Sequence, residues 1–171
     1  MEEKNKSSGL ENKKIKGAQE VTIGDIHFKS KLEGKVYQAL LASGIKAEYE
    51  PTTISLWKGH IPRTPFYTKD NSKNIKRGFF RHLILKKNKL VDIKYTPDFY
   101  FRYGDLDVWM EIKGYENDVF YIKKKLFIDY LDNKLHTSKQ KSIYFEIFNI
   151  SQLHEALEII KNYDRNKSTS D

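Results

Sequence analysis

Three charged residues lie close enough in this sequence to do chemistry as a group. Asp98 follows a proline, and Glu111 and Lys113 come later with one residue between them. Two carboxylates can bind a divalent cation, and an ammonium group beside them can orient a water molecule or a phosphate. Hard oxygen ligands in a chain without cysteine favour Mg²⁺ or Mn²⁺ over zinc. This chemistry requires the fold to bring the three side chains to one place.

The segment between Asp98 and Glu111 predicts a β-hairpin that would do so. Gly104-Asp105 is typical of a two-residue hairpin loop, with strands expected at 94–103 and 106–113. In this register Asp98 lies directly opposite Glu111, and Lys113 lies on the same face at roughly 7 Å from Glu111. The expected hairpin is half-buried, with one apolar face and one charged face.

The charged face has two interpretations. Like charges held ~4.5–5.5 Å apart destabilise a sheet, so either one carboxyl takes up a proton or a cation lies between Asp98 and Glu111. The alternative is a solvated hairpin whose acids face water. Arg102 opposite Asp107 is expected to be an ordinary cross-strand ion pair. The spacing alone leaves both interpretations open.

Composition limits the class of protein. A chain of 171 residues fits one domain with a proper core, and its hydrophobic fraction of 39% and charged fraction of 32% fit a small globular protein with charged margins. There is no apolar run near the length of a membrane span and no signal-peptide pattern, so a soluble, intracellular protein without a membrane partner is expected.

Positive charge is concentrated in one segment. The whole chain carries a formal charge of +8, and the segment from Lys58 to Lys94 holds eleven Lys or Arg against two Asp, a net +9. Aromatic residues alternate with these cations, which favours a polyanionic partner, most simply nucleic acid. The candidate contacts are Lys76, Arg77 and Arg81. The alternative is solubilising charge on a long loop.

The rest of the chain divides into a polar start, one domain and a polar end. Residues 1–20 and 163–171 are rich in polar and charged residues and are expected to be disordered. Residues 21–162 are expected to form a single domain with a basic insertion at about 58–81. The weak periodicity and the prolines of the insertion predict a long loop over residues 59–81.

Helices and strands alternate along the domain. Ser30 and Glu33 have the spacing of a capping box, and Gly44 is suited to end the helix that they begin. Besides the hairpin, the expected elements are a helix at 30–43, extended segments at 45–51 and 54–57, strands at 82–86 and 90–95 joined around 87–89, a helix at 118–133, a strand at 142–149 and a helix at 151–162. This order predicts an α/β sandwich around a mixed sheet.

With these elements placed, the chain resembles the PD-(D/E)xK nuclease superfamily. The signature of that superfamily is an acid after proline on one strand and an acid-x-lysine on the next. Here Pro97-Asp98 and Glu111-Ile112-Lys113 match it. Many members also place a glutamate on the first helix beside the site, and Glu33 occupies that place.

The resemblance covers about residues 28–149 without the basic insertion. The runs 28–33 and 119–127 look especially like small phage-encoded members, and the phage endonucleases that resolve Holliday junctions are more distant relatives. The resemblance implies a restriction-endonuclease-like core with the order helix, three strands, helix, strand, to which this chain adds a C-terminal helix.

The resemblance also implies roles for the site residues. Asp98, Glu111 and the Ile112 carbonyl would hold Mg²⁺ or Mn²⁺, and Lys113 would orient or help activate the attacking water. Glu33 would bind a second metal or a metal-bound water, a role compatible with helix capping. Similar nucleases often carry a basic residue on the helix after the signature, for which the candidates are Lys123, Lys124 and Lys125.

The function expected from this resemblance is a metal-dependent DNA endonuclease, selective for Holliday junctions or other branched DNA, in phage-type recombination, replication or packaging. Such an enzyme would work in the cytoplasm of an infected or host bacterial cell or in association with the virion. Branched or duplex DNA is the expected partner, and resolution of a symmetric junction would require a homodimer. The alternatives are an RNase and a non-catalytic nucleic-acid-binding or virion assembly protein on a nuclease fold.

Overall fold

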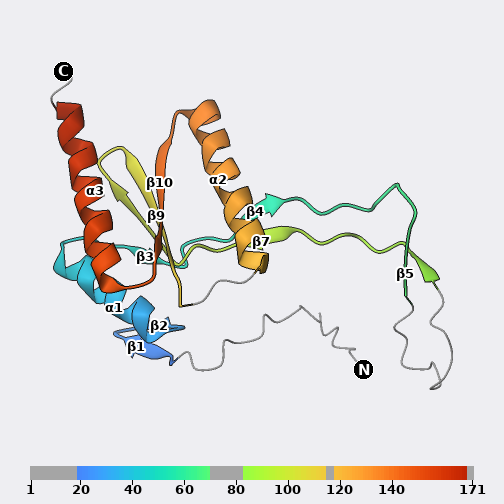
Figure 1. Ribbon diagram of the computed structural model, residues 1–171, viewed down its shortest axis with the longest axis horizontal. Helices are drawn as coiled ribbons and strands as arrows, with labels where there is room; N and C mark the ends of the chain where they lie inside the picture. Colours follow the sequence, from blue (N-terminus) through green and yellow to red (C-terminus); the bar gives the residue numbers. More distant parts are fainter. Residues whose placement is uncertain (1–18, 70–82, 115–117, 169–171) are drawn as a thin grey trace.

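A four-stranded mixed sheet forms the centre of the domain (Figure 1). The computed structural model describes residues 19–69, 83–114 and 118–168. The strand order is β10 (Lys141–Ile147), β9 (Leu106–Ile112), β8 (Phe99–Tyr103) and β3 (Glu48–Tyr49). β10 runs parallel to β9, whereas β8 is antiparallel to both β9 and β3. The expected α/β class with a mixed sheet is confirmed.

Helices cover both faces of this sheet. α1 (Lys31–Ala42) and α3 (Ile150–Ser168) lie on one face, where Phe99, Val108 and Met110 join their apolar residues in one core. α2 (Asp118–Ser138) lies on the other face, where Phe127 packs edge-on against Trp109 at 5.7 Å between ring centroids. None of the helices within the described residues is long and apolar enough to cross a membrane.

The hairpin of β8 and β9 has the predicted register. Phe99 pairs with Met110 and Tyr103 pairs with Leu106, and Gly104 takes the positive φ of 60° that the turn requires. The strand expected at 94–103 is interrupted, because Pro97 cannot donate a ladder hydrogen bond. Asp98 therefore lies immediately before β8, at the end of the ladder.

The expectation of a half-buried hairpin is wrong. Every residue of β9 is buried, including Trp109, Asp107 and Glu111 on the face expected to be charged. The reason is α2, whose apolar residues cover that face. The expected Arg102–Asp107 pair is also replaced: Asp107 accepts a hydrogen bond from the Tyr100 hydroxyl at 3.0 Å, and Arg102 donates to the Gly104 carbonyl.

The predicted helix starts and ends are confirmed for α1. The Ser30 side chain accepts a hydrogen bond from the Glu33 amide, and Gly44 follows the helix with φ 76°. The later elements are longer or shifted: α2 ends at Ser138, β10 at Ile147 and α3 at Ser168. Residues 163–168, expected to be disordered, are thus helical in backbone conformation.

A small hairpin precedes α1 and was not expected from the sequence. β1 (Val21–Ile23) and β2 (Ile26–Phe28) pair around Gly24, which has φ 58°. Phe28 is fully buried and contacts Phe99, with 6.3 Å between their ring centroids. The hairpin therefore joins the α1 side of the core. Apart from Gln19 and Glu20, the N-terminal segment lies outside the described residues.

The basic insertion is part of a projecting β-ribbon rather than a loop throughout. β4 (Ile54–Trp57) pairs with β7 (Ile93–Tyr95), and farther out β5 (Phe66–Lys69) pairs with β6 (Leu83–Lys86). We call residues 54–69 and 83–95 the β-arm; Figure 1 shows it extending away from the helices and the central sheet. The strands expected to meet around residues 87–89 instead pair with β4 and β5. Residues 70–82 lie outside the described residues.

Candidate active site

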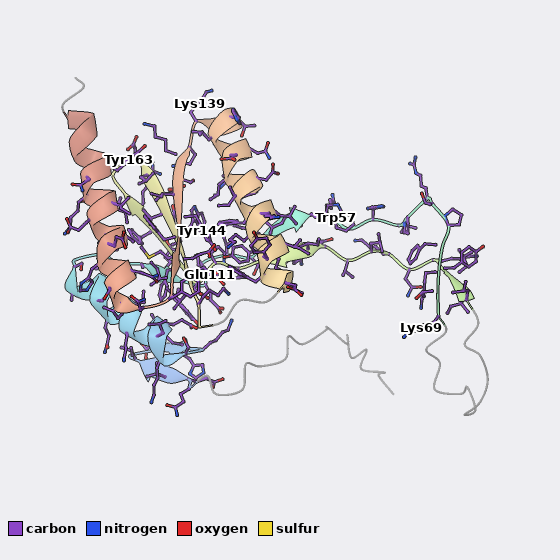
Figure 2. All side chains as sticks on the ribbon, in the orientation of Figure 1. Trp57, Lys69, Glu111, Lys139, Tyr144 and Tyr163 are labelled. Carbon is purple, nitrogen blue, oxygen red and sulfur yellow. The ribbon has the colours of Figure 1, made fainter. Side chains whose placement is uncertain are left out.

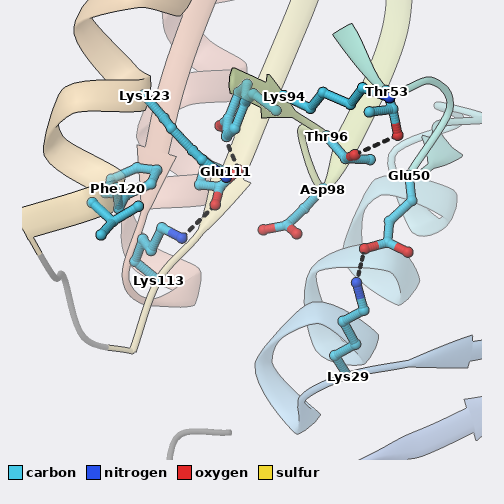
Figure 3. A pocket seen from close by; sticks show the side chains of 12 residues that line it. Lys29, Glu50, Thr53, Lys94, Thr96, Asp98, Glu111, Lys113, Phe120 and Lys123 are labelled. Atoms are coloured by element: carbon cyan, nitrogen blue, oxygen red, sulfur yellow. Dashed lines mark hydrogen bonds and ion pairs between the residues drawn. The ribbon is translucent and has the colours of Figure 1, made fainter. Parts of the chain in front are cut away.

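A polar pocket of about 480 Å³ opens where the end of the β8–β9 hairpin, the N-terminal end of α2 and the base of the β-arm meet (Figure 3). Its lining consists of Lys29, Glu50, Thr53, Lys94, Tyr95, Thr96, Asp98, Glu111, Lys113, Val119, Phe120 and Lys123. The three residues that the hairpin register was expected to bring together, Asp98, Glu111 and Lys113, all lie in this pocket.

Asp98 is held by the neighbouring strand. Its Oδ2 accepts a hydrogen bond of 2.7 Å from the backbone amide of Ile112. The amide and carbonyl of one strand residue point to the same side, so the Ile112 carbonyl also faces the Asp98 side of β9. The carboxylate and the carbonyl expected to share a metal are therefore oriented toward the same region.

Glu111 is fixed through both carboxylate oxygens. Oε2 accepts a hydrogen bond of 2.5 Å from the hydroxyl of Tyr95, and Oε1 forms an ion pair with Lys113. The Lys113 ammonium also lies 3.8 Å from the ring centroid of Phe120. Tyr95 is itself within hydrogen-bond distance of Tyr144, at 3.3 Å between the hydroxyls. The carboxylate is thus held in one orientation.

Burial raises the pKa of both carboxyls. For Asp98 the pKa is well above its usual range because of desolvation and then the charge of Glu111, although the Ile112 amide opposes the shift. For Glu111 desolvation raises the pKa, while the charge and hydrogen bond of Lys113 and the Tyr95 hydroxyl oppose it. The interpretation of acids facing water is wrong for Glu111, which is 5% exposed.

Glu33 is placed differently from the other predicted site residues. It is buried, and its carboxylate accepts hydrogen bonds from the Lys29 amide at 2.9 Å, the Ser30 hydroxyl at 2.8 Å and the Tyr49 hydroxyl at 2.6 Å. Among the described residues it is not part of the pocket lining. Its charge nevertheless helps to raise the pKa of Asp98, so it lies near the site. It contacts the N-cap residue Ser30, but it accepts from the amide of Lys29 rather than that of Ser30, as a full capping box would require; its role as a metal ligand stays a prediction.

The predicted cations of α2 separate into different environments. Lys123 lines the pocket, whereas Lys124 forms an ion pair with Glu146 of β10 at 2.9 Å. Lys125 lies on the exposed side, 4.8 Å from the ring centroid of Tyr121. Lys123 is therefore the residue of this band best placed to meet a ligand in the pocket. The candidate contacts Lys76, Arg77 and Arg81 lie outside the described residues.

The pocket contains residues that the sequence analysis did not select. Lys94 and Tyr95 come from β7, and Lys29 and Glu50 form an ion pair on the opposite wall. Glu50 has φ 45°, unusual for a residue with a side chain, and its amide donates to the Asp98 carbonyl at 2.8 Å. Burial would lower the pKa of Lys29, but Glu50 and the other nearby carboxylates raise it overall. No local pattern marked these residues, since long-range pairing places them.

The donor set of the pocket fits a hard cation with few protein ligands. Within the described residues no three His, Cys, Asp or Glu side chains form a metal-binding group. Mg²⁺ commonly takes one or two carboxylates and completes its shell with water and substrate phosphate oxygens. Asp98, Glu111 and the Ile112 carbonyl match that pattern. A site made of these oxygens would be open on the pocket side.

Comparison with known proteins identifies a family but no activity. A family model of proteins of unknown function, DUF1064, matches residues 13–146. The chain belongs to the DUF1064 family. No curated protein and no solved structure matches it. The matched residues 13–146 include β8, β9, all of α2 and every residue that lines the pocket.

The raised pKa values predict how stability depends on pH in metal-free buffer. The folded state keeps protons on Asp98 and Glu111 at pH values where the unfolded chain, with ordinary values of 3.8 and 4.5, has released them. The folded state then binds more protons, so stability must fall as pH rises through this window, by about 1.4 kcal/mol per unit of raised pKa. Urea unfolding in EDTA from about pH 4 to about pH 7 should show a steeper decline for wild type than for Asp98→Asn.

The control for this measurement is Asp132→Asn, which changes an exposed carboxyl of α2. Its pH profile should follow that of wild type. If Asp98→Asn and wild type lose stability in parallel across the range, the pKa of Asp98 is not raised in the folded protein as described.

Proposed function

We propose that this DUF1064 protein is a metal-dependent DNA endonuclease with a PD-(D/E)xK-type active site. The observation that carries the proposal is that the buried Glu111 and the half-buried Asp98 line the same polar pocket, with the Lys113 ammonium against Glu111. Burying two carboxylates together is unfavourable unless a cation or proton compensates. A divalent cation bound by both carboxylates would provide this compensation.

The order of elements supports the same proposal. α1 is followed by β3, β8 and β9, then by α2 and β10, which is the order of helices and strands in the core of that superfamily. Asp98 lies immediately before β8, Glu111 lies on β9 and Lys113 directly follows β9, close to the placement that the resemblance implies. Fold order alone does not establish an activity, so the proposal depends on the site.

In this proposal each residue of the pocket has a role in phosphodiester hydrolysis. When bound, Mg²⁺ would supply positive charge at a phosphate oxygen and acidify a water molecule. Lys113, positioned by Glu111 and Phe120, would orient that water for attack on phosphorus. The water would release a proton to solvent as its oxygen bonds to phosphorus, and the leaving oxygen would take up a proton from solvent as its bond to phosphorus breaks. Lys94 and Lys123 stand at the pocket and would attract the flanking phosphates.

Substrate selection is proposed to depend on shape rather than base sequence. The cationic side chains of the pocket are suited to phosphates, which carry no sequence information. We therefore retain branched DNA of phage-type recombination, replication or packaging as the proposed substrate. Binding without cleavage would instead favour a non-catalytic DNA-binding or assembly protein.

The first test separates chemistry from binding. Asp98→Asn and Lys113→Ala should each lower the cleavage rate by at least about 100-fold, because the first removes a charged ligand of the metal and the second removes the ammonium that orients the attacking water. The assay uses labelled four-way junction, duplex and single-stranded DNA with Mg²⁺, Mn²⁺ or EDTA. Binding of the junction, measured by fluorescence anisotropy in EDTA, should change much less. Lys125→Ala on the exposed side of α2 is the matched control and should cleave like wild type.

Two results would contradict the endonuclease proposal. One is cleavage that persists in EDTA or in both variants, because the activity would then come from another site or a contaminant. The other is tight binding of every DNA without metal-dependent cleavage by wild type.

A second test concerns the residue that orients Glu111. Tyr95→Phe removes only the hydroxyl that donates to Oε2, and loss of such a partner typically weakens metal binding about 10–100-fold. We expect the Mn²⁺ concentration for half-maximal cleavage to rise by that factor, with the rate largely recovered at saturating Mn²⁺. The control is Tyr121→Phe, which removes the hydroxyl of a half-exposed tyrosine of α2 and should leave the Mn²⁺ titration unchanged. An equal shift in both variants, or none in Tyr95→Phe, would show that Tyr95 does not position the ligand.

A further inference from the structure

The outer part of the β-arm carries an exposed apolar face. In the β5–β6 ladder, Tyr67 pairs with Leu85 and Lys69 pairs with Leu83, so these side chains share one face of the ribbon. Tyr67 is 60% exposed, Leu83 71% and Leu85 41%. Figure 2 shows this part of the arm, around the labelled Lys69, far from the helices. We call Tyr67, Leu83 and Leu85 the tip face.

Exposed leucines on a two-stranded ribbon need an explanation. Such a ribbon is marginally stable by itself, and contiguous exposed apolar side chains usually mark a binding surface. Nearer the domain, Ile61 and Val91 are also exposed, at 69% and 81%. These exposed apolar side chains therefore indicate that the β-arm binds a partner.

Charge identifies the class of partner. The described β-arm holds seven Lys or Arg against one acid, Asp92. A second copy of this chain would bring a second cationic arm, which would be repelled, whereas a polyanion would be attracted. Nucleic acid is the partner that this charge favours.

The base of the β-arm forms part of the pocket. Thr53, just before β4, and Thr96, just after β7, join their hydroxyls at 2.7 Å, and both residues line the pocket with Lys94 and Tyr95. From Trp57 to Phe66 the chain can span at most roughly 30 Å. That reach is comparable to one turn of DNA, about 34 Å. DNA held in the pocket could therefore also contact the tip face.

We propose that the tip face binds unstacked bases of branched or gapped DNA, while the lysines of the β-arm bind the adjoining phosphates. An intact duplex offers phosphates and hydrated groove edges, against which leucine gains little. Base faces become available where stacking is interrupted, and apolar side chains bind there as wedges or stacking partners. The inference rests on the proposed DNA substrate and adds a second contact, which would provide the selectivity for DNA structure.

The test compares the binding of three DNAs by wild type and two double variants. The double variant Leu83→Ser, Leu85→Ser leaves the charge of the β-arm unchanged, and Leu135→Ser, Ile159→Ser changes two exposed apolar residues of α2 and α3 as a control. Fluorescence anisotropy in EDTA at one fixed salt concentration measures the Kd for a four-way junction, a gapped duplex and an intact duplex. The arm variant should lose about tenfold in affinity for junction and gapped DNA, the scale of one stacked base, and under about twofold for intact duplex. The control variant should bind all three DNAs with the affinity of wild type.

Tyr67→Ala provides a second variant if the double variant disturbs the ribbon, and it should show the same selective loss. Equal losses on all three DNAs, or no loss on any, would overturn the inference. So would sedimentation showing that wild type is a dimer without DNA and the double variant a monomer, because the tip face would then join two copies. Selective binding by a protein that never cleaves would reject the endonuclease but not the tip-face contact. Metal-dependent cleavage, with DNA binding unchanged by the substitutions in the tip face, would support the endonuclease and reject the tip-face contact.

Discussion

The site depends on one unfavourable arrangement, in which the buried carboxylate of Glu111 and the half-buried carboxylate of Asp98 lie near each other. Desolvation raises the pKa of both carboxyls, and the charge of Glu111 raises that of Asp98 further; the Ile112 amide, the Tyr95 hydroxyl and the Lys113 ammonium oppose these shifts. Each of these neighbours is supplied by a different constraint of the fold. The hairpin register places the amide, the β-arm places the tyrosine, and strand alternation along β9 places the lysine.

The elements that build the core also build the pocket. α2 covers the second face of the sheet with Phe127. Nearer its N-terminal end, the same helix places Phe120 against the Lys113 ammonium and Lys123 at the pocket. β7 pairs with β4 at the base of the β-arm and points Tyr95 inward, where it is 5% exposed. Packing and site geometry are thus coupled, so that loosening α2 would also release Glu111 and Lys113. This coupling gives the carboxylates fixed positions before any ligand binds.

What could be predicted from the sequence was local. The Gly104-Asp105 turn determines the register of β8 and β9, and Ser30 with Glu33 marks the start of α1, because neighbouring residues control both features. Burial of the second face of β9 could not be predicted, since α2 comes from a separate part of the chain. Tyr95, Glu50 and Lys94 were missed for the same reason. The strand expected at 82–86 corresponds to β6, but β5 lies in the segment expected to be a loop, and their pairing was missed because the two strands are short and far apart in sequence.

The central claim is that the carboxylates of Asp98 and Glu111 share one divalent cation, and anomalous scattering would test it most directly. Crystals of the Lys113→Ala variant with DNA and Mn²⁺ would retain both carboxylates while slowing cleavage. The account predicts a manganese peak bonded to both side chains, at about 2.0–2.3 Å from their oxygens, with a phosphate in the same coordination shell. Crystals with DNA in the pocket and manganese elsewhere, or absent, would contradict it.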